Sequence, residues 1–504
     1  MPGLKLTRRD SSVRKLHVRS GLVPFADLRE WLSALEKAGE LQRVRTEVDW
    51  NLEAGAVVRR LCETNGPAVL FEKIKDYPKG FRILGAPMAQ SQRHRYARLA
   101  IALDLPPGSS VKEITEVYLK RRRNPIPPVL VSSAPCQENV LQGVEIDLFR
   151  FPVPLIHGGD GGRYIGTWHT VITKDPMSGW VNYGMYRLMV LGKNRMGGLI
   201  GPIQDFQRHL SEYKRLGRRM EFAVAIGTEP VTAMMSCVSV QGKKSEAEVI
   251  GGLRGKPLEL VHCKTVDLEV PATAEIVLEG FMNPDELEEE GPFGEYTGYV
   301  GGRQPRPVFH VTAVTHRNDP ILTMTSIGVP VDEDHVVMPI ANAAEVLEEV
   351  RDRKGFPVDF IYVLPESAQH FWVVSTKVPD KTYPHRLAMA IWSTKSGRYA
   401  NYLLLVNDDV EITDLRSVIW ALSTRVHPVR DVWQVPHAYT SILVPFLSPE
   451  ERKSGDGAYM LLDGTWPADL SPDEIPEVSS FNHLWPEEIR EKVLARWKEY
   501  GFEK

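Results

Sequence analysis

The chain has 504 residues, of which 43% are hydrophobic and 25% are charged, and its formal net charge is −4. This length predicts about two or three domains, and the composition is that of an ordinary globular protein. A small negative net charge provides no field that would attract nucleic acid or an anionic membrane, so we expect neither as a partner. No apolar run in the sequence reaches the roughly 18 residues that a membrane-spanning helix needs.

The first residues of the chain are basic and lack an apolar core, so we expect an N-terminal arm over 1–20 rather than a secretory signal. The four cysteines are widely spaced and form no CxxC motif. This spacing favours reduced thiols and a cytoplasmic location.

Residues 21–128 are predicted to form an α/β region. Asp27, followed by Glu30 three residues later, is typical of a capped helix start, and Gly39 can end that helix. Short apolar runs such as AVLF and FRILGA then alternate with helical patterns. The alternation favours strands that are covered by helices.

A β-rich region is predicted over 129–325, where β-branched runs such as HTVITK, FAVAIG and PVFHVTAVTH are separated by turn residues. The pattern favours a mostly antiparallel sheet or barrel. A linker over 326–340 leads to a second α/β pattern over 341–480. The fold class expected for the whole chain is therefore mixed α/β, or α+β.

The last segment, 481–504, is expected to be a helical tail. Four apolar residues recur on one side of its helix: Trp485, Ile489, Val493 and Trp497. Because the tail has little of its own chain to pack against, we expect it to dock across a subunit interface. The sequence thus predicts a homodimer or a larger even-numbered oligomer, with the 341–480 domain taking part in dimerisation.

The stretch EEEGPFGEYTGY, residues 288–299, carries the glutamates Glu290 and Glu295. The Gly-Pro-Phe-Gly between them combines a restricted backbone with the absence of any polar side chain. Burial raises the pKa of a glutamate and a neighbouring arginine lowers it, so such a pair can provide one proton donor and one fixed anion. The alternative is a solvated acidic loop, which we expect for Glu288 and Glu289.

Glycine-rich backbone precedes two polar residues in the stretch 158–187. Four glycines lie within GGDGG and its flanks, and Asn182 and Arg187 follow them. Glycines let backbone N–H groups approach a phosphate, and an arginine can bind one with two hydrogen bonds. The spacing matches no known nucleotide fingerprint, so this signal alone is weak.

Two further stretches contain carboxylates that could bind a metal. Asp205 begins a helix in IGPIQDFQRHL, where an N-cap role is the alternative, and His209 lies on or beside its apolar face, where packing is the commoner role. Glu246 and Glu248 precede a glycine-rich turn in SEAEVIGGLRG. Asparagine with carboxylates suits Mg²⁺ or Mn²⁺ better than zinc.

In their order and intervals these motifs resemble the UbiD-like decarboxylases that depend on prenylated flavin mononucleotide (prenylated FMN). The resemblance runs from about residue 20 to 480, and WVNYGMYR, SEAEVIGGLRG, EGPFGEYTGY and DDVEITDLRSVIWALSTR carry it. It implies a split-barrel-like cofactor domain and a Glu–Arg–Glu network made of Glu290, Arg187 and Glu295. In that network Glu295 would protonate the carbon that CO₂ leaves, and Glu290 would hold Arg187.

The resemblance also implies a set of cofactor and metal residues. A divalent metal, Mn²⁺ or Mg²⁺, would bridge to the cofactor phosphate through Asn182, Asp205 and Glu246, and the carbonyl of Trp180 would help to hold K⁺. Asp205 stands where the family usually has a histidine, so either Asp205 is the ligand, which we favour, or His209 serves. The cofactor-binding residues implied in all are Asn182, Gly184, Met185, Tyr186, Arg187, Gln204, Asp205, Glu246 and Lys395.

For the substrate, the resemblance implies an unsaturated, aromatic or heteroaromatic carboxylic acid, decarboxylated reversibly. Tyr296, Ser441 and Leu443 would line its pocket, and a flavin prenyltransferase would supply the cofactor. Two other functions stay open. One is a metal-dependent hydrolase that uses Asn182, Asp205 and Glu246 with Glu295 as base, and the other is a non-catalytic assembly protein on the same fold.

Overall fold

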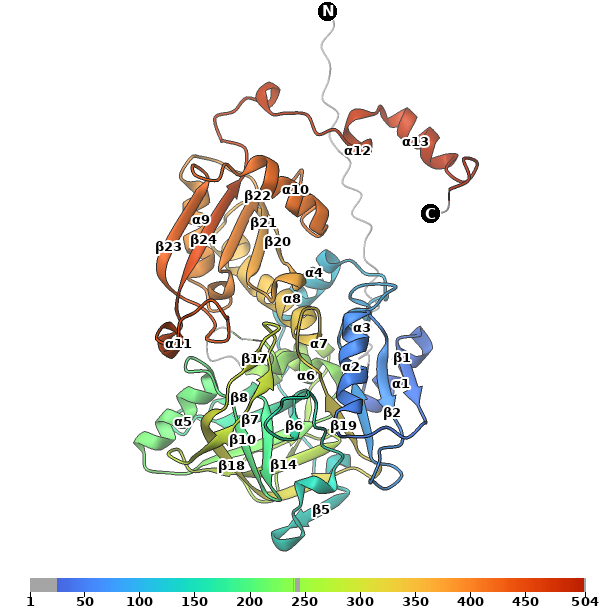
Figure 1. The fold of residues 1–504 in the computed structure, drawn as a ribbon, viewed down its shortest axis with the longest axis vertical. Coiled ribbons are helices and arrows are strands. Elements are labelled where there is room, and N and C mark those ends of the chain that lie inside the picture. Colours follow the sequence, from blue (N-terminus) through green and yellow to red (C-terminus); the bar gives the residue numbers. More distant parts are fainter. Residues whose placement is uncertain (1–24, 239, 241–244, 503–504) are drawn as a thin grey trace, which may run out of the picture. The chain divides into compact units, whose positions relative to one another are not determined.

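The computed structural model describes residues 25–238, 240 and 245–502. The chain forms two compact units that divide between Glu345 and Val346 (Figure 1). The predicted N-terminal arm, 1–20, lies outside the described residues. Each unit combines β-sheets with helices, which confirms the predicted mixed α/β class.

The first helix, α1 (Leu28–Ala38), begins and ends at the predicted signals. The Asp27 side chain accepts a hydrogen bond from the backbone N–H of Glu30 at 2.9 Å. Gly39 ends the helix with φ 73°, a left-handed conformation that glycine adopts without strain. The side chains that α1 buries recur at helical spacing: Leu28, Trp31, Leu32 and Leu35.

A four-stranded sheet with the order β1-β2-β3-β19 follows α1. Its strands are β1 (Leu41–Val44), β2 (Ala68–Phe71), β3 (Arg82–Gly85) and β19 (Ile321–Met324). Helices α2 (Glu53–Glu63), α3 (Ala97–Ala102) and α4 (Val111–Arg122) belong to the same region. β19 falls in the range predicted for the β-rich region, yet it pairs in parallel with β3, and all four of its residues are buried there.

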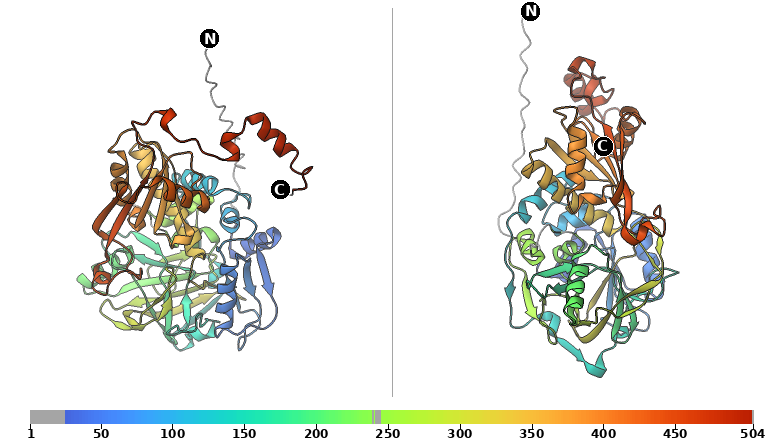
Figure 2. Two further views of the ribbon diagram at one scale, coloured as in Figure 1. Left: turned by 45° about the horizontal axis from the view of Figure 1, so that its top comes forward. Right: turned by 90° about the vertical axis from the view of Figure 1, so that its left-hand side faces the viewer.

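The large sheet contains ten strands, and every neighbouring pair in it is antiparallel. The strands are β5 (Asn139–Gln142), β6 (Tyr164–Gly166), β7 (His169–Lys174), β8 (Val181–Gly184), β9 (Leu188–Gly192), β10 (Arg195–Gly198), β11 (Met220–Ile226), β14 (Ile276–Met282), β15 (Leu287–Glu290) and β18 (Gln304–His316). In both views of Figure 2 these green-to-yellow strands lie beside the blue N-terminal elements. The predicted antiparallel β-rich region is thus confirmed.

Helices and two small sheets complete the first unit. The helices are α5 (Asp205–Arg215), α6 (Pro230–Ser236), α7 (Glu246–Arg254) and α8 (Glu333–Leu347), and α8 continues past the boundary between the units. The small sheets contain β4 (Val129–Leu130), β12 (Glu259–His262) and β13 (Glu269–Pro271) in one, and β16 (Phe293–Gly294) and β17 (Val300–Gly301) in the other. Part of the predicted linker over 326–340 is therefore helix.

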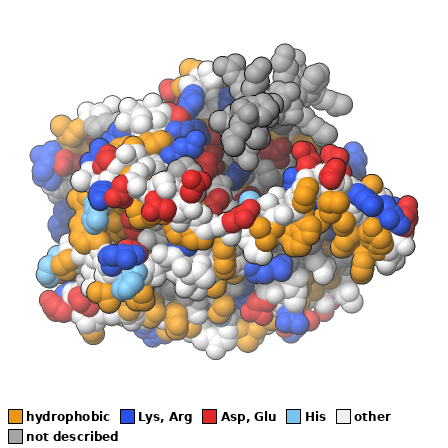
Figure 3. Space-filling view, turned by 90° about the horizontal axis from the view of Figure 1, so that it is seen from above, with side chains coloured by type: hydrophobic (Ala, Val, Ile, Leu, Met, Phe, Trp, Pro, Cys, Tyr) orange, Lys and Arg blue, Asp and Glu red, His pale blue; other side chains and the backbone are white. Residues whose placement is uncertain are grey.

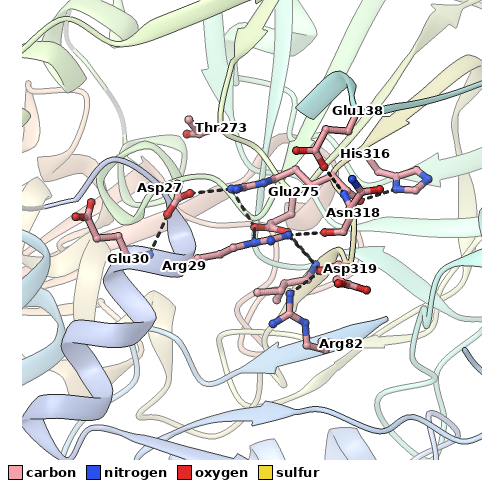
Figure 4. Close-up of polar contacts among 12 residues, drawn as sticks. Asp27, Arg29, Glu30, Arg82, Glu138, Thr273, Glu275, His316, Asn318 and Asp319 are labelled. Atoms are coloured by element: carbon pink, nitrogen blue, oxygen red, sulfur yellow. Dashed lines mark hydrogen bonds and ion pairs between the residues drawn. The ribbon is translucent and has the colours of Figure 1, made fainter. Parts of the chain in front are cut away.

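An ionic network around the buried Glu275 joins α1 to the large sheet (Figure 4). Arg29 donates two hydrogen bonds of 2.8 Å to Glu275, whose side chain is fully buried at the start of β14. Arg317 binds both Asp27, at 2.8 Å, and Glu275, at 3.4 Å. The backbone N–H of Ile321, the first residue of β19, donates to the same glutamate at 3.2 Å. One carboxylate thus connects three segments that are far apart in sequence.

The second unit contains a five-stranded sheet with the order β20-β21-β22-β24-β23. Its three central strands are parallel and both edge strands are antiparallel to their neighbours. The strands are β20 (Val358–Val363), β21 (Phe371–Thr376), β22 (Tyr402–Val406), β23 (Val432–Tyr439) and β24 (Asp456–Gly464), and the helices are α9 (Tyr383–Trp392), α10 (Leu415–Arg425) and α11 (Glu451–Ser454).

The tail ends in α12 (Phe481–Leu484) and α13 (Glu487–Ala495), as the sequence predicts. Apolar side chains stand exposed along it, including Trp485 at 48% and Leu494 at 62%. Figure 3 shows hydrophobic side chains on the face of the chain that carries this tail. Among the residues described, no helix has both the length and the apolar character that would be needed to cross a membrane.

Candidate active site

The two glutamates of the EEEGPFGEYTGY stretch lie at opposite ends of a constrained turn. Glu290 is the last residue of β15, and Glu295 follows β16 directly. Gly291 has φ 87°, and a Cβ at this position would come within 2.8 Å of the Gly302 carbonyl oxygen, so only glycine fits. The backbone N–H of Glu295 donates to the Tyr299 carbonyl at 2.9 Å, which closes the loop between β16 and β17.

Arg187, in the connection between β8 and β9, bridges the two carboxylates. Its Nε and Nη2 donate to the two oxygens of Glu290 at 2.9 and 2.7 Å, which is the bidentate geometry of a strong charge-assisted pair. Its Nη1 donates to Oε1 of Glu295. The predicted Glu–Arg–Glu arrangement therefore exists as a set of direct contacts.

Apolar surfaces cover this arrangement. The exposed fractions are 0% for Glu290, 7% for Glu295 and 8% for Arg187. The Phe293 ring, from the turn itself, lies 5.5 Å from the Arg187 guanidinium, within the range of a cation–π contact. The Tyr164 ring packs on Phe293 with centroids 4.1 Å apart, and its hydroxyl donates to Glu290 at 2.8 Å. No sequence motif points to Tyr164, because only the pairing of β6 with β9 brings it here.

The two carboxylates have different electrostatic surroundings. Burial raises the pKa of Glu295 to about 7, Arg187 acts against this shift, and the charges of Glu290 and Asp334 add to it. Three donors point at Glu290, two from Arg187 and one from Tyr164, which suits an anion. Burial opposes the charge of Arg187, but the two glutamates raise its pKa, so it stays a cation. The site can hold one fixed ion pair and one carboxyl that exchanges its proton near neutral pH.

The glycine-rich stretch supports the turn. The backbone N–H of Gly161 donates to the Pro292 carbonyl at 2.8 Å. A Cβ on Gly161 would lie 2.0 Å from the Gly291 carbonyl oxygen, so the backbones can approach this closely only at glycine. An arginine can bind a phosphate or a carboxylate. In the structure the Arg187 guanidinium pairs with the carboxylate of Glu290.

The three residues predicted to bind the divalent metal lie on β8 and on the two helices α5 and α7, which both pack against β8, and Tyr186 follows that strand. The Nδ2 of Asn182, in β8, lies 3.4 Å from the Tyr186 hydroxyl. Burial raises the pKa of Tyr186, the hydrogen bond with Asn182 acts against this shift, and the charges of Asp205 and Glu246 add to it. Asp205 and Glu246 are the first residues of α5 and α7. An amide and two carboxylates form an oxygen donor set that fits Mg²⁺ or Mn²⁺.

Asp205 is the first residue of α5, as predicted, but the alternative N-cap role is wrong. Gln204, and not Asp205, occupies the N-cap position of α5, and the Gln204 side chain accepts a hydrogen bond from the backbone N–H of Gly201 at 2.6 Å. His209, one turn later, is fully buried. Its Nδ1 lies 3.0 Å from the Thr173 hydroxyl.

Three other residues predicted for the cofactor or K⁺ lie on or beside β8: Trp180, Gly184 and Met185. A Cβ on Gly184 would come within 2.3 Å of the Tyr186 oxygen, and the Met185 sulfur is 3.6 Å from that of Cys237. The Trp180 carbonyl accepts a hydrogen bond from the Asp175 backbone N–H at 2.8 Å. Within the described ranges, no group of three or more His, Cys, Asp or Glu is placed to hold a metal, and the Asn182 set contains only two such residues.

Three predicted residues belong to the second unit and are described there. Lys395 follows the end of α9. Ser441, which is 7% exposed, follows β23, and its hydroxyl accepts a hydrogen bond from the backbone N–H of Leu443 at 3.4 Å. Tyr296 belongs to the first unit, where it is partly buried beside Glu295.

Three family models match the chain in consecutive segments. They describe the N-terminal, Rift-related and C-terminal domains of 3-octaprenyl-4-hydroxybenzoate carboxy-lyase, and they match residues 32–118, 129–330 and 335–464. This chain belongs to the UbiD family. Its enzyme class is that of the UbiD carboxy-lyases.

Individual UbiD-family relatives resemble the chain over almost its whole length. Pyrrole-2-carboxylic acid decarboxylase of Pseudomonas aeruginosa is 35% identical over 94% of this chain and 98% of its own. The UbiD-class enzyme HmfF of Pelotomaculum thermopropionicum, solved with FMN, has a TM-score of 0.78 and 33% identity over 90% of this chain and 97% of its own. An evolved dimeric form of HmfF with prenylated FMN gives 0.76 and 32% over 89% and 97%.

Proposed function

We propose that this chain catalyses the reversible, non-oxidative decarboxylation of an unsaturated, aromatic or heteroaromatic carboxylic acid with the help of prenylated FMN. The observation that carries the proposal is the buried contact of Arg187 with both Glu290 and Glu295, together with the pKa of about 7 for Glu295. Membership of the UbiD family, the pyrrole-2-carboxylic acid decarboxylase relative and the flavin-bound HmfF structures support it.

In the proposed reaction each of the three residues has one task. Arg187 orients the substrate carboxylate, and Glu290 keeps the guanidinium charged and fixed in direction through two hydrogen bonds. When the bond to the carboxyl group breaks, CO₂ leaves and its bonding electrons remain on the substrate carbon. Glu295 gives its proton to that carbon, and solvent then restores the proton of Glu295. In the reverse direction Glu295 accepts the proton of the C–H bond.

Prenylated FMN, when bound, supplies an electrophilic ring that stabilises the electrons left by the departing CO₂. We assign its phosphate to a Mn²⁺ or Mg²⁺ ion held by Asn182, Asp205 and Glu246, whose oxygen donors suit such an ion. The carbonyl of Trp180 would contribute to a K⁺ site. The remaining assignments for the cofactor are Gly184, Met185, Tyr186, Gln204 and, from the second unit, Lys395.

The pocket assignments rest on position in the sequence and on exposure. Tyr296 is adjacent to the proposed acid, and Ser441 and Leu443 follow β23 in the second unit. A small serine at this position leaves room for a wide or hydroxylated ring. Their test is a comparison of Ser441→Phe with the parent on small and large aromatic acids, in which the large acids should lose turnover selectively.

The proposal includes three further expectations. The chain works in the cytoplasm, a flavin prenyltransferase supplies its cofactor, and it forms a homodimer or larger even-numbered oligomer. The expected oligomer rests on two exposed apolar surfaces of the second unit. One is the tail, and the other is the outer face of α10, where Leu415, Ile419 and Trp420 are exposed by 38%, 51% and 42%. A second copy of the chain is the occupant that we propose for both.

The test is a reconstitution. The chain is produced together with a flavin prenyltransferase, its flavin absorbance is recorded, and a panel of aromatic and heteroaromatic acids is screened for CO₂ release. Glu295→Gln should retain the flavin and lose turnover by at least about 100-fold, the low end for a general acid. Exchange of the product C–H with D₂O should fall in parallel, because it is the reverse of the same proton transfer. Ester hydrolysis that depends on the metal, without CO₂ release, would instead favour a hydrolase.

A further inference from the structure

Four consecutive ionisable residues, 332–335, span the start of α8 and contact the active-site turn through His335. Three of them, Asp332, Glu333 and His335, have an exposed fraction of 0%. The sequence DEDH has no metal-ligand or nucleophile spacing, and the proposed reaction uses none of these residues. Burying these groups costs free energy unless a partner compensates each charge. The partners of these residues therefore indicate their role.

Both ring nitrogens of His335 have fixed partners. Nε2 lies 2.6 Å from the carbonyl oxygen of Tyr296, and because a carbonyl only accepts, Nε2 must carry a hydrogen and donate it. Nδ1 lies 2.8 Å from an oxygen of Asp332 and 3.1 Å from the Asp332 backbone nitrogen. The imidazole therefore points one N–H at the active-site turn, and the start of α8 sets its orientation.

Asp332 is itself held in place. Its carboxylate accepts a hydrogen bond from the backbone N–H of Gly328 at 3.0 Å and lies 3.3 Å from Nη1 of Arg59. The same guanidinium donates to the Ser326 and Val329 carbonyls, each at 3.0 Å. Arg59 lies on α2, so the N-terminal region fixes the loop that precedes α8.

The carbonyl that His335 binds is part of the peptide next to the proposed acid. The turn is tight: the Gly298 backbone N–H donates to the Glu295 carbonyl at 2.9 Å, and the Glu295 N–H donates to Tyr299 at the same distance. Anchoring the Tyr296 carbonyl therefore fixes the backbone from which the Glu295 side chain projects.

We propose that His335 is a positioning residue for the active site. Its Nε2–H holds the Tyr296 carbonyl and so keeps the Glu295 carboxyl buried against Arg187, while Asp332 fixes the imidazole in the required direction. The inference rests on the proposed role of Glu295 as proton donor.

The charges around His335 agree with this geometry. Burial opposes the positive charge of the imidazole, but Asp332 and Asp334 raise its pKa. Burial likewise opposes the charge of Asp332, and both His335 and Arg59 lower its pKa. The charge of Asp334 also raises the pKa of Glu295. Asp332 and the Tyr296 carbonyl thus contact the ring, Arg59 lies behind Asp332, and the charge of Asp334 acts on the ring as well.

The experiment compares two variants of His335 with a matched control in the flavin-loaded enzyme. His335→Phe keeps a ring but has no donor, whereas His335→Gln keeps an N–H that can reach the carbonyl. His310→Phe is the control. His310 lies on β18 and also forms a histidine–carboxylate pair, with Glu286 at 2.8 Å. His335→Phe should lose about 10- to 100-fold in kcat at unchanged flavin content, His335→Gln should recover most of it, and the control should stay near the parent.

The pH profile separates positioning from a simple charge effect. If the turn loosens in His335→Phe, Glu295 gains solvent, its pKa falls, and the loss of activity at high pH begins at lower pH than in the parent. If His335 acts only as a positive charge near Glu295, removing it would raise that pKa and move the loss to higher pH. A downward shift supports the proposal, and an upward shift or no shift overturns it.

Hydrogen–deuterium exchange tests the anchor without using activity. Peptides that cover residues 294–300 should exchange faster in His335→Phe than in the parent, with the rate restored in His335→Gln and unchanged in His310→Phe. Unchanged exchange in His335→Phe overturns the proposal. A parent enzyme that releases no CO₂ but shows this exchange pattern would instead contradict the proposed function and leave the anchor standing, so the two failures are distinguishable.

Discussion

Turnover should fall as the pH rises through about 7, because the proposed donor Glu295 has a pKa of about 7 and must be protonated to act. Well above that pH, each further unit should reduce the rate about tenfold. The cause is burial, which favours the neutral carboxyl although Arg187 stands beside it.

The magnitude follows from the ordinary glutamate pKa of 4.5 and the value of about 7 in the folded chain. The difference corresponds to about 3 kcal/mol of preference for the neutral form. Because the folded pKa is the higher one, this contribution to the free energy of unfolding is fully present below pH 4.5 and is lost as the pH rises through about 7. The same titration therefore weakens both stability and turnover on the alkaline side.

Replacing Glu290 gives a prediction with a definite sign. The negative charge of Glu290 raises the pKa of Glu295, so Glu290→Gln should move the alkaline loss of turnover to lower pH. Tyr164→Phe is the matched control, because it removes one hydrogen bond to Glu290, 2.8 Å long, and leaves the charge in place. Its profile should keep the position of the parent.

The assay measures initial rates of CO₂ release per bound flavin from about pH 5 to about pH 9. Thermal unfolding of each variant at the same pH values separates loss of fold from loss of catalysis. An upward shift of the profile in Glu290→Gln would contradict the electrostatic account. Near-normal turnover in Glu295→Gln, combined with loss of turnover in Glu290→Gln, would exchange the two proposed roles.

Three further predictions concern the metal, the tail and the ionic network. Asp205→Ala should lose bound flavin and metal, measured by absorbance and elemental analysis, whereas His209→Ala should retain both; loss in the histidine variant alone would move the ligand one helical turn. Deleting 481–504 should reduce the mass measured by light scattering to that of a monomer, and a parent that is already monomeric at micromolar concentration would refute the proposed assembly. Arg29→Met should lower the free energy of unfolding by about 3 kcal/mol because it leaves a buried carboxylate with fewer partners. The pair of Lys381 with Asp469, whose side chains are exposed by 74% and 61%, is the control, and Lys381→Met should cost less than about 1 kcal/mol in denaturant unfolding.

Much of the fold follows from local patterns in the sequence. The Asp27 cap and Gly39 end of α1 are local signals, and local structure reproduces both. Antiparallel strands separated by turns are also visible as short β-branched runs. The pairing of β19 with β3 is different in kind, because 235 residues separate Gly85 from the start of β19 at Ile321 and no periodic pattern encodes such a partner.

The residues of the site also differ in whether the local sequence reveals them. Glu290 and Glu295 are conspicuous because the turn between them is stiff and apolar. Tyr164 and His335 escape notice because each looks ordinary in its own segment and gains meaning only from a contact more than 35 residues away, to Glu290 and to Tyr296. Residues that act on the backbone or carboxylate of another segment leave no spacing signature of their own.

The parallel pairing of β19 with β3 has a consequence for how the gene can be divided. The family models treat 32–118 and 129–330 as separate segments, but the strand that completes the four-stranded sheet is encoded at the end of the second. A fragment that starts at 129 would expose an apolar strand with no neighbour, and a fragment that ends at 118 would expose the open edge of β3. Neither piece is an independent module, so recombination or truncation at this boundary should yield aggregating protein rather than a minimal enzyme.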